Sequence, residues 1–184
     1  MENHLFTGIT TCSLCLIRRP NEILLGRKMK KLVIGKWNGF GGRKEMGENI
    51  RATTAREAFE ETGGKLGNGS GIIIQPENLQ PVAILYFHNK YEDGASFIIK
   101  VVVCQVFIWS GRAVATDEMT TPTFFRLERL PFSQMAPGDR YWLPPVLDGK
   151  MVIGHIHYSP GQKSLLVPPE IEIVRYLEEA ELED

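Results

Sequence analysis

The sequence lacks the features that mark several specialised classes of protein. It has only three cysteines, Cys12, Cys15 and Cys104, an odd number that does not form a disulfide framework. Its formal net charge of −1 argues against a protein that coats nucleic acid or a membrane surface. No apolar run approaches the roughly 18 residues that span a bilayer, and the acidic start MENHLF does not resemble a signal peptide. We therefore expect a cytoplasmic protein whose partners include neither a membrane nor a nucleic-acid polymer.

Two patterns that resemble metal sites are weak. Cys12 and Cys15 have the C-x-x-C spacing of redox and zinc sites, without a second such pair or a nearby histidine. They lie in an alternating apolar stretch, where positions three apart point to opposite faces of a sheet. His155 and His157 share one face of a predicted strand, but no third ligand is close in sequence. We interpret all four as packing residues.

The order of the predicted elements indicates one α/β domain. With 43% hydrophobic and 23% charged residues, the 184-residue chain can form a substantial core. A helix is expected from about Asn49 to Gly63 and Gly64, and an extended C-terminal helix over about 169–183. Strands are expected over residues 4–18, 22–27, 79–88, 95–110, 122–130 and 151–158. This order predicts a mixed sheet covered by helices, in a single domain spanning 1–184.

The first predicted helix carries Glu57, Glu60 and Glu61 on one face. Like charges at these spacings repel, and negative charge near a helix C-terminus opposes the macrodipole, each by about a few tenths of a kcal/mol. Mg²⁺ or Mn²⁺ would relieve the repulsion, since both prefer carboxylate oxygens. Such an ion can also neutralise a polyphosphate and acidify a bound water. The opposite side, expected to pack on the core, consists of Ala52, Ala55, Phe59 and Thr62.

Residues 42–64 have the pattern G-x5-E-x7-R-E-A-F-E-E-T-G-G. It resembles the Nudix box of the Nudix hydrolases, G-x5-E-x7-R-E-U-x-E-E-x-G-U, in which U is apolar. The one departure is Gly64 at the final apolar position, which we expect to loosen the packing after the helix. The resemblance implies a Nudix α/β/α sandwich with a mixed sheet, and Mg²⁺, or Mn²⁺ in its place, as the cofactor.

The same resemblance implies roles for individual residues. Glu57 and Glu61 would be the principal metal ligands, and Glu60 a ligand or the general base. Arg56 would hold the glutamates in orientation, with Glu48 as its partner rather than as a ligand. The remaining candidate ligands are the Gly42 carbonyl and Glu118, and the candidate catalytic residues are Arg56, Glu60, Glu61 and Glu118.

Three further segments, GKWNGFGG at 35–42, TDEM at 116–119 and LPFSQMAPGDRYW at 130–142, resemble the eukaryotic-type MutT homologues, which are oxidised-purine nucleoside triphosphatases. An amide at Asn38 would read the base, because it offers both a donor and an acceptor. Lys28 would lie near the triphosphate. The other implied substrate contacts are Phe40, Leu32 and Asp139.

The base-reading segment departs from that family. Its usual Trp-Pro-Asp-Asp is here Ala136-Pro137-Gly138-Asp139, so one acid and the tryptophan that stacks on the base are missing. Stacking on an aromatic side chain is worth about 1–3 kcal/mol per base. The change therefore bears on selectivity for 8-oxoguanine, and Trp142 and Tyr141 are the aromatic residues that could compensate.

Together these resemblances predict Mg²⁺-dependent hydrolysis of a purine (deoxy)nucleoside triphosphate to monophosphate and pyrophosphate. Oxidised nucleotides such as 8-oxo-dGTP are the first candidates, and the purpose would be sanitation of the nucleotide pool. Two alternatives stay open. One is a Nudix pyrophosphohydrolase of nucleoside diphosphate-linked compounds such as ADP-ribose, whose members carry a proline near the place of Pro81. The other is a non-catalytic nucleotide-binding Nudix module, although such modules typically lose box glutamates and this chain keeps them.

Overall fold

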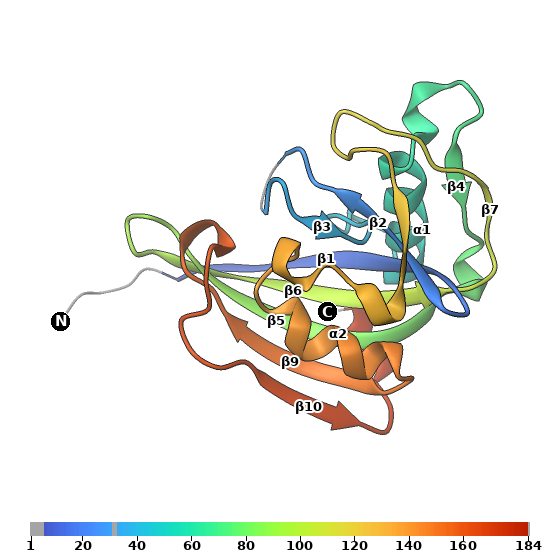
Figure 1. Cartoon of the computed structure of the whole chain (residues 1–184). Helices are drawn as coiled ribbons and strands as arrows, with labels where there is room; N and C mark the ends of the chain where they lie inside the picture. Colours follow the sequence, from blue (N-terminus) through green and yellow to red (C-terminus); the bar gives the residue numbers. More distant parts are fainter. Residues whose placement is uncertain (1–5, 31–32, 184) are drawn as a thin grey trace.

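A computed structural model describes residues 6–30 and 33–183 (Figure 1). Leu32, a predicted substrate contact, lies outside the described residues. Eight of the described strands form one sheet in the order β10-β9-β5-β6-β1-β2-β3, with β8 paired to β2, while β4 and β7 form a separate pair. The strands are β1 (Phe6–Arg19), β2 (Glu22–Arg27), β3 (Trp37–Asn38), β4 (Gly71–Ile73), β5 (Gln80–Lys90), β6 (Ser96–Val106), β7 (Ser110–Arg112), β8 (Thr123–Arg126), β9 (Met151–His157) and β10 (Glu170–Val174). The helices are α1 (Ile50–Glu61), α2 (Asp139–Leu147) and α3 (Glu179–Glu183).

The large sheet is mixed, as the sequence predicts. β1 pairs in parallel with β6, and β5 in parallel with β9, whereas the remaining pairs are antiparallel. The strand expected over 122–130 is shorter than predicted, because the chain turns into a 3₁₀ helix at Leu127–Arg129. Pro81 lies on β5, beside a shift in its register with β6.

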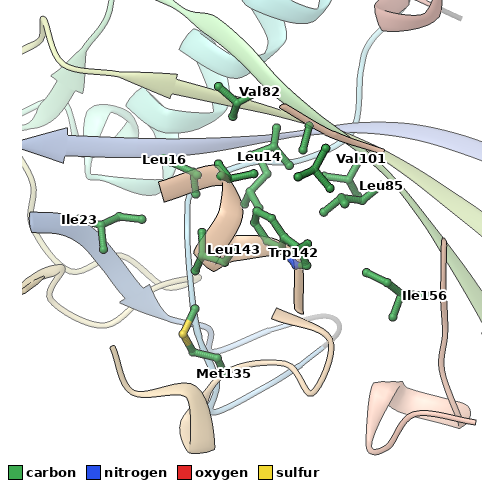
Figure 2. Packing of buried hydrophobic residues seen from close by; sticks show 14 of the residues in the cluster. Leu14, Leu16, Ile23, Val82, Leu85, Val101, Met135, Trp142, Leu143 and Ile156 are labelled. Atoms are coloured by element: carbon green, nitrogen blue, oxygen red, sulfur yellow. The ribbon is translucent and has the colours of Figure 1, made fainter. Parts of the chain in front are cut away.

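Helices cover both faces of the sheet, and β1 contributes side chains to the core on each face. Leu14 and Leu16 face a core cluster that includes Trp142 and Leu143 of α2 (Figure 2). Cys15 and Ile17 face the opposite cluster, which includes Ile50 of α1. Cys12 packs on the α2 side, so the two cysteines of C-x-x-C point to opposite faces, as predicted. This arrangement confirms the α/β/α sandwich.

Helix α1 begins as the sequence predicts but packs on a different face. The side chain of Asn49 accepts a hydrogen bond from the Ala52 N–H at 2.9 Å, which satisfies a free donor of the first turn. The expected packing face is wrong in part, because Phe59 is 37% exposed. The helix instead buries Ile50, Thr53, Thr54, Ala58 and Glu61. The buried threonine hydroxyls donate to backbone carbonyls of the preceding turn, which makes their burial tolerable.

Phe59 explains the departure at the end of the box. A Cβ atom at Gly64 would lie 2.3 Å from the Phe59 ring, and one at Gly71 would lie 2.7 Å from the same ring. The ring therefore fills the space where the usual apolar side chain would stand. The expected loosening of the packing after α1 is not found.

The extended C-terminal helix predicted over about 169–183 is wrong. Residues Glu170–Val174 form the edge strand β10, antiparallel to β9, and only Glu179–Glu183 are helical. The sequence EIEIV alternates with a period of two, so Ile171 can face the core while the glutamates face outward. Pro168 and Pro169, which would be acceptable at the start of a helix, here precede a strand. Among the described helices, none is long and apolar enough to cross a membrane.

Candidate active site

The structure gathers the predicted carboxylates around one cavity of about 160 Å³. Glu57, Glu60 and Glu61 reach it from the last turns of α1, and Glu118 reaches it from the loop before β8. The full lining is Glu45, Arg56, Glu57, Glu60, Glu61, Lys65, Leu66, Thr116, Asp117 and Glu118. We call this space the acidic cavity. Glu45, Lys65 and Asp117 were not predicted from the sequence.

Arg56 connects two of the glutamates. Its guanidinium donates to both oxygens of Glu48, at 2.7 Å from Nε and 2.9 Å from Nη2, and its Nη1 donates to Glu57 at 2.8 Å. Bidentate pairing of this kind fixes a geometry as well as adding energy. The hydrogen bonds from Arg56 lower the pKa of Glu48 to about 2. The predicted pairing of Arg56 with Glu48 is thus present.

Glu61 is the most enclosed of the acids, with 4% of its surface exposed. It accepts a hydrogen bond from the Gly41 N–H at 2.8 Å, and Lys28 Nζ lies 3.5 Å from its other oxygen. Burial raises the pKa of Glu61, and the charges of Glu57 and Glu118 raise it further, against the effect of Lys28. A bound cation would therefore strongly stabilise the ionised form of Glu61.

Two glycines allow the backbone to approach these acids. A Cβ at Gly41 would lie 2.1 Å from the Ser13 carbonyl oxygen, and one at Gly42 would lie 2.4 Å from the Glu57 carboxyl carbon. The Gly42 carbonyl accepts from the Ser13 N–H at 2.8 Å. A carbonyl oxygen has two lone pairs, so one remains available to a ligand.

The donor set of the acidic cavity suits a hard divalent cation, since it consists of carboxylate oxygens. Several of these oxygens are held by the protein's own cations: Glu60 lies 2.6 Å from Lys65 Nζ and 3.6 Å from Arg56 Nη1. Accordingly, within residues 6–30 and 33–183, no three histidine, cysteine or acidic side chains are already grouped as an ion would require. The chemistry of the donors fits a metal, and both protein cations contact the same Glu60 oxygen, Oε2.

A second cavity, of about 510 Å³, opens on the α2 side of β1 and β6. We call it the apolar cavity, because apolar atoms form most of its wall. Three predicted substrate contacts line it, namely Lys28, Asn38 and Asp139. The complete lining is Thr10, Cys12, Ser13, Leu14, Lys28, Val33, Asn38, Gly41, Gly42, Arg43, Phe87, Ile99, Val101, Ala136, Asp139, Trp142 and Gln162. Lys28 and Gly41 contact Glu61, so they connect the apolar cavity to the acidic one.

Asp139 is buried at the start of α2. Its two oxygens accept from the Trp142 indole at 3.0 Å and from the Ala136 N–H at 3.1 Å. Burial nevertheless raises the pKa of Asp139 to about 7. Trp142 forms part of the cavity wall, whereas Tyr141, the other aromatic candidate, is 45% exposed and does not line it.

Phe40 does not have the predicted position. Its ring is fully buried in the core on the α1 side and does not line the apolar cavity, because the strand pairing of Phe40 with Cys15 turns it to that face. The predicted contact between Phe40 and substrate is wrong. Asn38 does line the cavity, and its side-chain oxygen also accepts from the Gly39 N–H at 3.0 Å, which shapes the turn.

Sequence reasoning missed much of the cavity wall. Phe87, Ile99 and Val101 come from the central strands, and only the sheet register brings them beside Asn38. No pattern in the sequence indicated that Gln162 would line the cavity. Gln162 adopts a positive φ of 55° in a turn, and its side-chain amide donates to Asn89 at 2.9 Å. The alternation of apolar residues was the one signal that could have placed the strand residues on a common face.

The fold and the acidic cavity define a Nudix-type protein. The NUDIX domain family matches residues 9–146, which is most of the chain, and the chain belongs to this family. Nudix hydrolases act on small nucleotides and generally use divalent metal ions.

Similar proteins include the oxidized purine nucleoside triphosphate hydrolases of Danio rerio and Mus musculus. Each is 30% identical over 147 residues, which cover 80% of this chain and 85% of the relative. Among solved structures, a MutT protein from Bacillus halodurans is similar with a TM-score of 0.70 and 22% identity, over 89% of this chain and 97% of that one. A MutT Nudix hydrolase from Burkholderia pseudomallei has a TM-score of 0.53 and 21% identity, over 67% and 87% of the two chains. The two structures support the fold.

Proposed function

We propose that this protein hydrolyses purine (deoxy)nucleoside triphosphates to monophosphate and pyrophosphate and thereby cleanses the nucleotide pool. The observation that carries the proposal is the connection of two cavities of different chemistry through Lys28 and Gly41. The apolar cavity suits a base, and the acidic cavity suits the metal ions that accompany a triphosphate. Oxidised purines are the first candidates, since the curated relatives named above act on them.

In the acidic cavity, Glu57 and Glu61 would hold the ion, with Glu60, Glu118 and the Gly42 carbonyl as further oxygen donors. We propose Mg²⁺, which Mn²⁺ could replace. When bound, the ion supplies charge neutralisation and an acidified water.

Other side chains of the protein orient the metal ligands or neutralise the charge of the phosphates. Arg56 keeps Glu57 in place through its contact with Glu48. Where Glu60 does not ligate the ion, it would serve as the general base for the attacking water. Lys28 provides positive charge at the junction of the cavities, where the phosphates would pass.

In the apolar cavity, Asn38 and Asp139 would read the base, with Trp142 as the aromatic wall. A second acid at position 138 is excluded as the structure stands, because a Cβ on Gly138 would lie 2.4 Å from the Tyr158 hydroxyl. Base reading therefore depends on one acid, whose pKa of about 7 lets it accept or donate a hydrogen bond near neutrality. This predicts weaker discrimination among purines than a site with two acids would give.

A panel of nucleotides tests the proposal. It contains dGTP, 8-oxo-dGTP, dATP, 2-oxo-dATP, a pyrimidine triphosphate and ADP-ribose, with separate detection of pyrophosphate and phosphate. We expect pyrophosphate release from purine triphosphates, dependent on Mg²⁺, and a loss of at least about a hundredfold in Glu61→Gln with the fold retained. Turnover of ADP-ribose far above every triphosphate would overturn the choice of substrate. Equal inertness of wild type and Glu61→Gln would favour the non-catalytic module.

A further inference from the structure

The segment before the end of the described chain crosses the amino-terminal end of α1. Leu182 is 1% exposed and packs in the same core cluster as Ile50, the first residue of α1. The buried Lys100 of β6 donates from its ammonium to the Glu181 carbonyl. This packing holds residues 181–183 against the domain.

Glu183 forms hydrogen bonds with the first residue of α1. Its carboxylate accepts from the Ile50 N–H, at 3.1 Å to one oxygen and 3.2 Å to the other. That N–H belongs to the first turn of α1, where helix N–H groups lack partners within the helix. A negative charge there is also favoured by the macrodipole. A residue 133 positions away along the chain thus supports the start of α1.

Glu183 also holds the loop that leads into α1. Lys44 Nζ donates to the Glu183 carboxylate at 2.9 Å and to its carbonyl at 2.5 Å. The side chains of Lys44 and Glu183 are 19% and 35% exposed, so water screens this pair only in part. These contacts lower the pKa of Glu183 against the effect of its burial.

The loop over residues 42–49 carries Gly42 at one end and Glu48 at the other. Its first half is anchored to β1, where the Lys44 N–H donates to the Thr11 carbonyl at 3.0 Å. Arg56 donates to the Arg43 carbonyl at 3.2 Å. Glu183 supplies a further anchor from a distant part of the chain, since it binds the Lys44 side chain and the helix start together.

From these contacts we propose that Glu183 is a positioning residue for the acidic cavity. By holding Lys44 and the Ile50 N–H at once, it fixes the loop that presents the Gly42 carbonyl and the Glu48–Arg56 pair to the metal-binding glutamates. It lies outside the Nudix box and outside residues 9–146, and it touches neither cavity. The inference rests on the proposed function, because it assumes that the acidic cavity binds a divalent ion.

The test compares three variants of the full chain. Glu183→Ala removes the carboxylate that binds Lys44 and the Ile50 N–H, and leaves Lys44 only the backbone carbonyl of residue 183. Glu183→Gln keeps a side-chain oxygen that can accept from Ile50 and Lys44. Glu179→Ala is the matched control, because Glu179 belongs to the same short helix but pairs with Arg51 at 2.6 Å and is 67% exposed. Mn²⁺ affinity is measured by electron paramagnetic resonance without nucleotide, and amide exchange is followed over residues 42–50.

For Glu183→Ala we expect Mn²⁺ to bind about 3–10-fold more weakly, which is less than the roughly 10–100-fold typical of groups that bond a metal ligand directly. Exchange at residues 42–50 should become faster, and kcat should fall more than KM changes. Glu183→Gln should restore most of the Mn²⁺ affinity, and Glu179→Ala should match the wild type.

Unchanged Mn²⁺ affinity and unchanged exchange in Glu183→Ala, with only a lower melting temperature, would overturn the positioning role. Failure of the proposed function gives a different result, namely Mn²⁺ binding by the wild type without turnover of any triphosphate. Absence of Mn²⁺ binding by the wild type would overturn both.

Discussion

The ammonium of Lys28 lies 3.5 Å from the buried carboxylate of Glu61, and the same lysine lines the apolar cavity. One cation therefore contacts both halves of the candidate active site. Its charge opposes the burial that raises the pKa of Glu61. The pair links the ionisation of a candidate metal ligand to the place where a substrate's phosphates would lie.

Removal of this lysine should move the pH dependence of the reaction. In Lys28→Met the pKa of Glu61 rises further, so at a given acidic pH more of the carboxyl is protonated and cannot bind a cation. We expect the acidic limb of the kcat/KM profile to move to higher pH. Lys150→Met is the control, since Lys150 is exposed just after α2 and lines neither cavity. If the acidic limb of the profile lies at the same pH in Lys28→Met and in the wild type, Lys28 does not control the ionisation of Glu61.

Restoring an aromatic residue at position 136 should strengthen base binding. Ala136 lines the apolar cavity, and the MutT-type motif that this segment resembles has a tryptophan at this place; stacking is worth about 1–3 kcal/mol per base. We expect Ala136→Trp to lower KM for purine triphosphates by about fivefold, which corresponds to the smaller end of that range. Steady-state kinetics on the nucleotide panel measures this change in KM. Tyr141→Trp, outside the cavity, should leave KM as it is, and a raised KM in Ala136→Trp would show that the space is needed for the base.

The buried Asp139 should make stability fall as pH rises. Its pKa is raised from 3.8 to about 7, so between these values the folded protein binds more protons at this site than the unfolded chain. The free energy of unfolding then decreases with pH across this window. In Asp139→Asn this contribution is absent. Denaturant titrations should show the wild type losing stability relative to the variant from about pH 4 to about pH 7, and a constant difference would refute the assignment.

The contact between Phe59 and Gly64 should appear as a coupling in stability. In Gly64→Ala the new Cβ would lie 2.3 Å from the ring, so the ring must move, at a cost of about 1–3 kcal/mol. In a Phe59→Ala background the same change meets no ring and should cost much less. Urea denaturation of the four proteins of this cycle measures the coupling, which we expect to exceed about 0.5 kcal/mol. Additive effects would mean that the ring does not fill this space.

Local chemistry made part of this structure predictable. Asn49 caps α1 because its side chain bonds three residues ahead, and Glu48, just before the helix, is within reach of the long Arg56 side chain further along it. The box spacing similarly indicated which glutamates share a cavity. These relations depend on residues close together in sequence, where spacing determines geometry.

The remainder depends on contacts between distant segments. Phe40 was misplaced because its direction is set by pairing with Cys15, which spacing within 35–42 does not reveal. The C-terminal helix was misplaced because β9 offers an edge to which EIEIV can pair. The polar composition of that segment, with four glutamates near its end, favoured a helix until the tertiary partner was known.

The parallel register of β1 with β6 has a consequence for biosynthesis. Cys12 of β1 lies opposite Val101 of β6. About ninety further residues must therefore be translated before β1 can pair with β6. Loop closure of that length slows folding, and the apolar middle of β1 stays uncovered on the emerging polypeptide meanwhile. Chaperone dependence during synthesis should therefore concentrate on the interval before the hairpin of β5 and β6 leaves the ribosome.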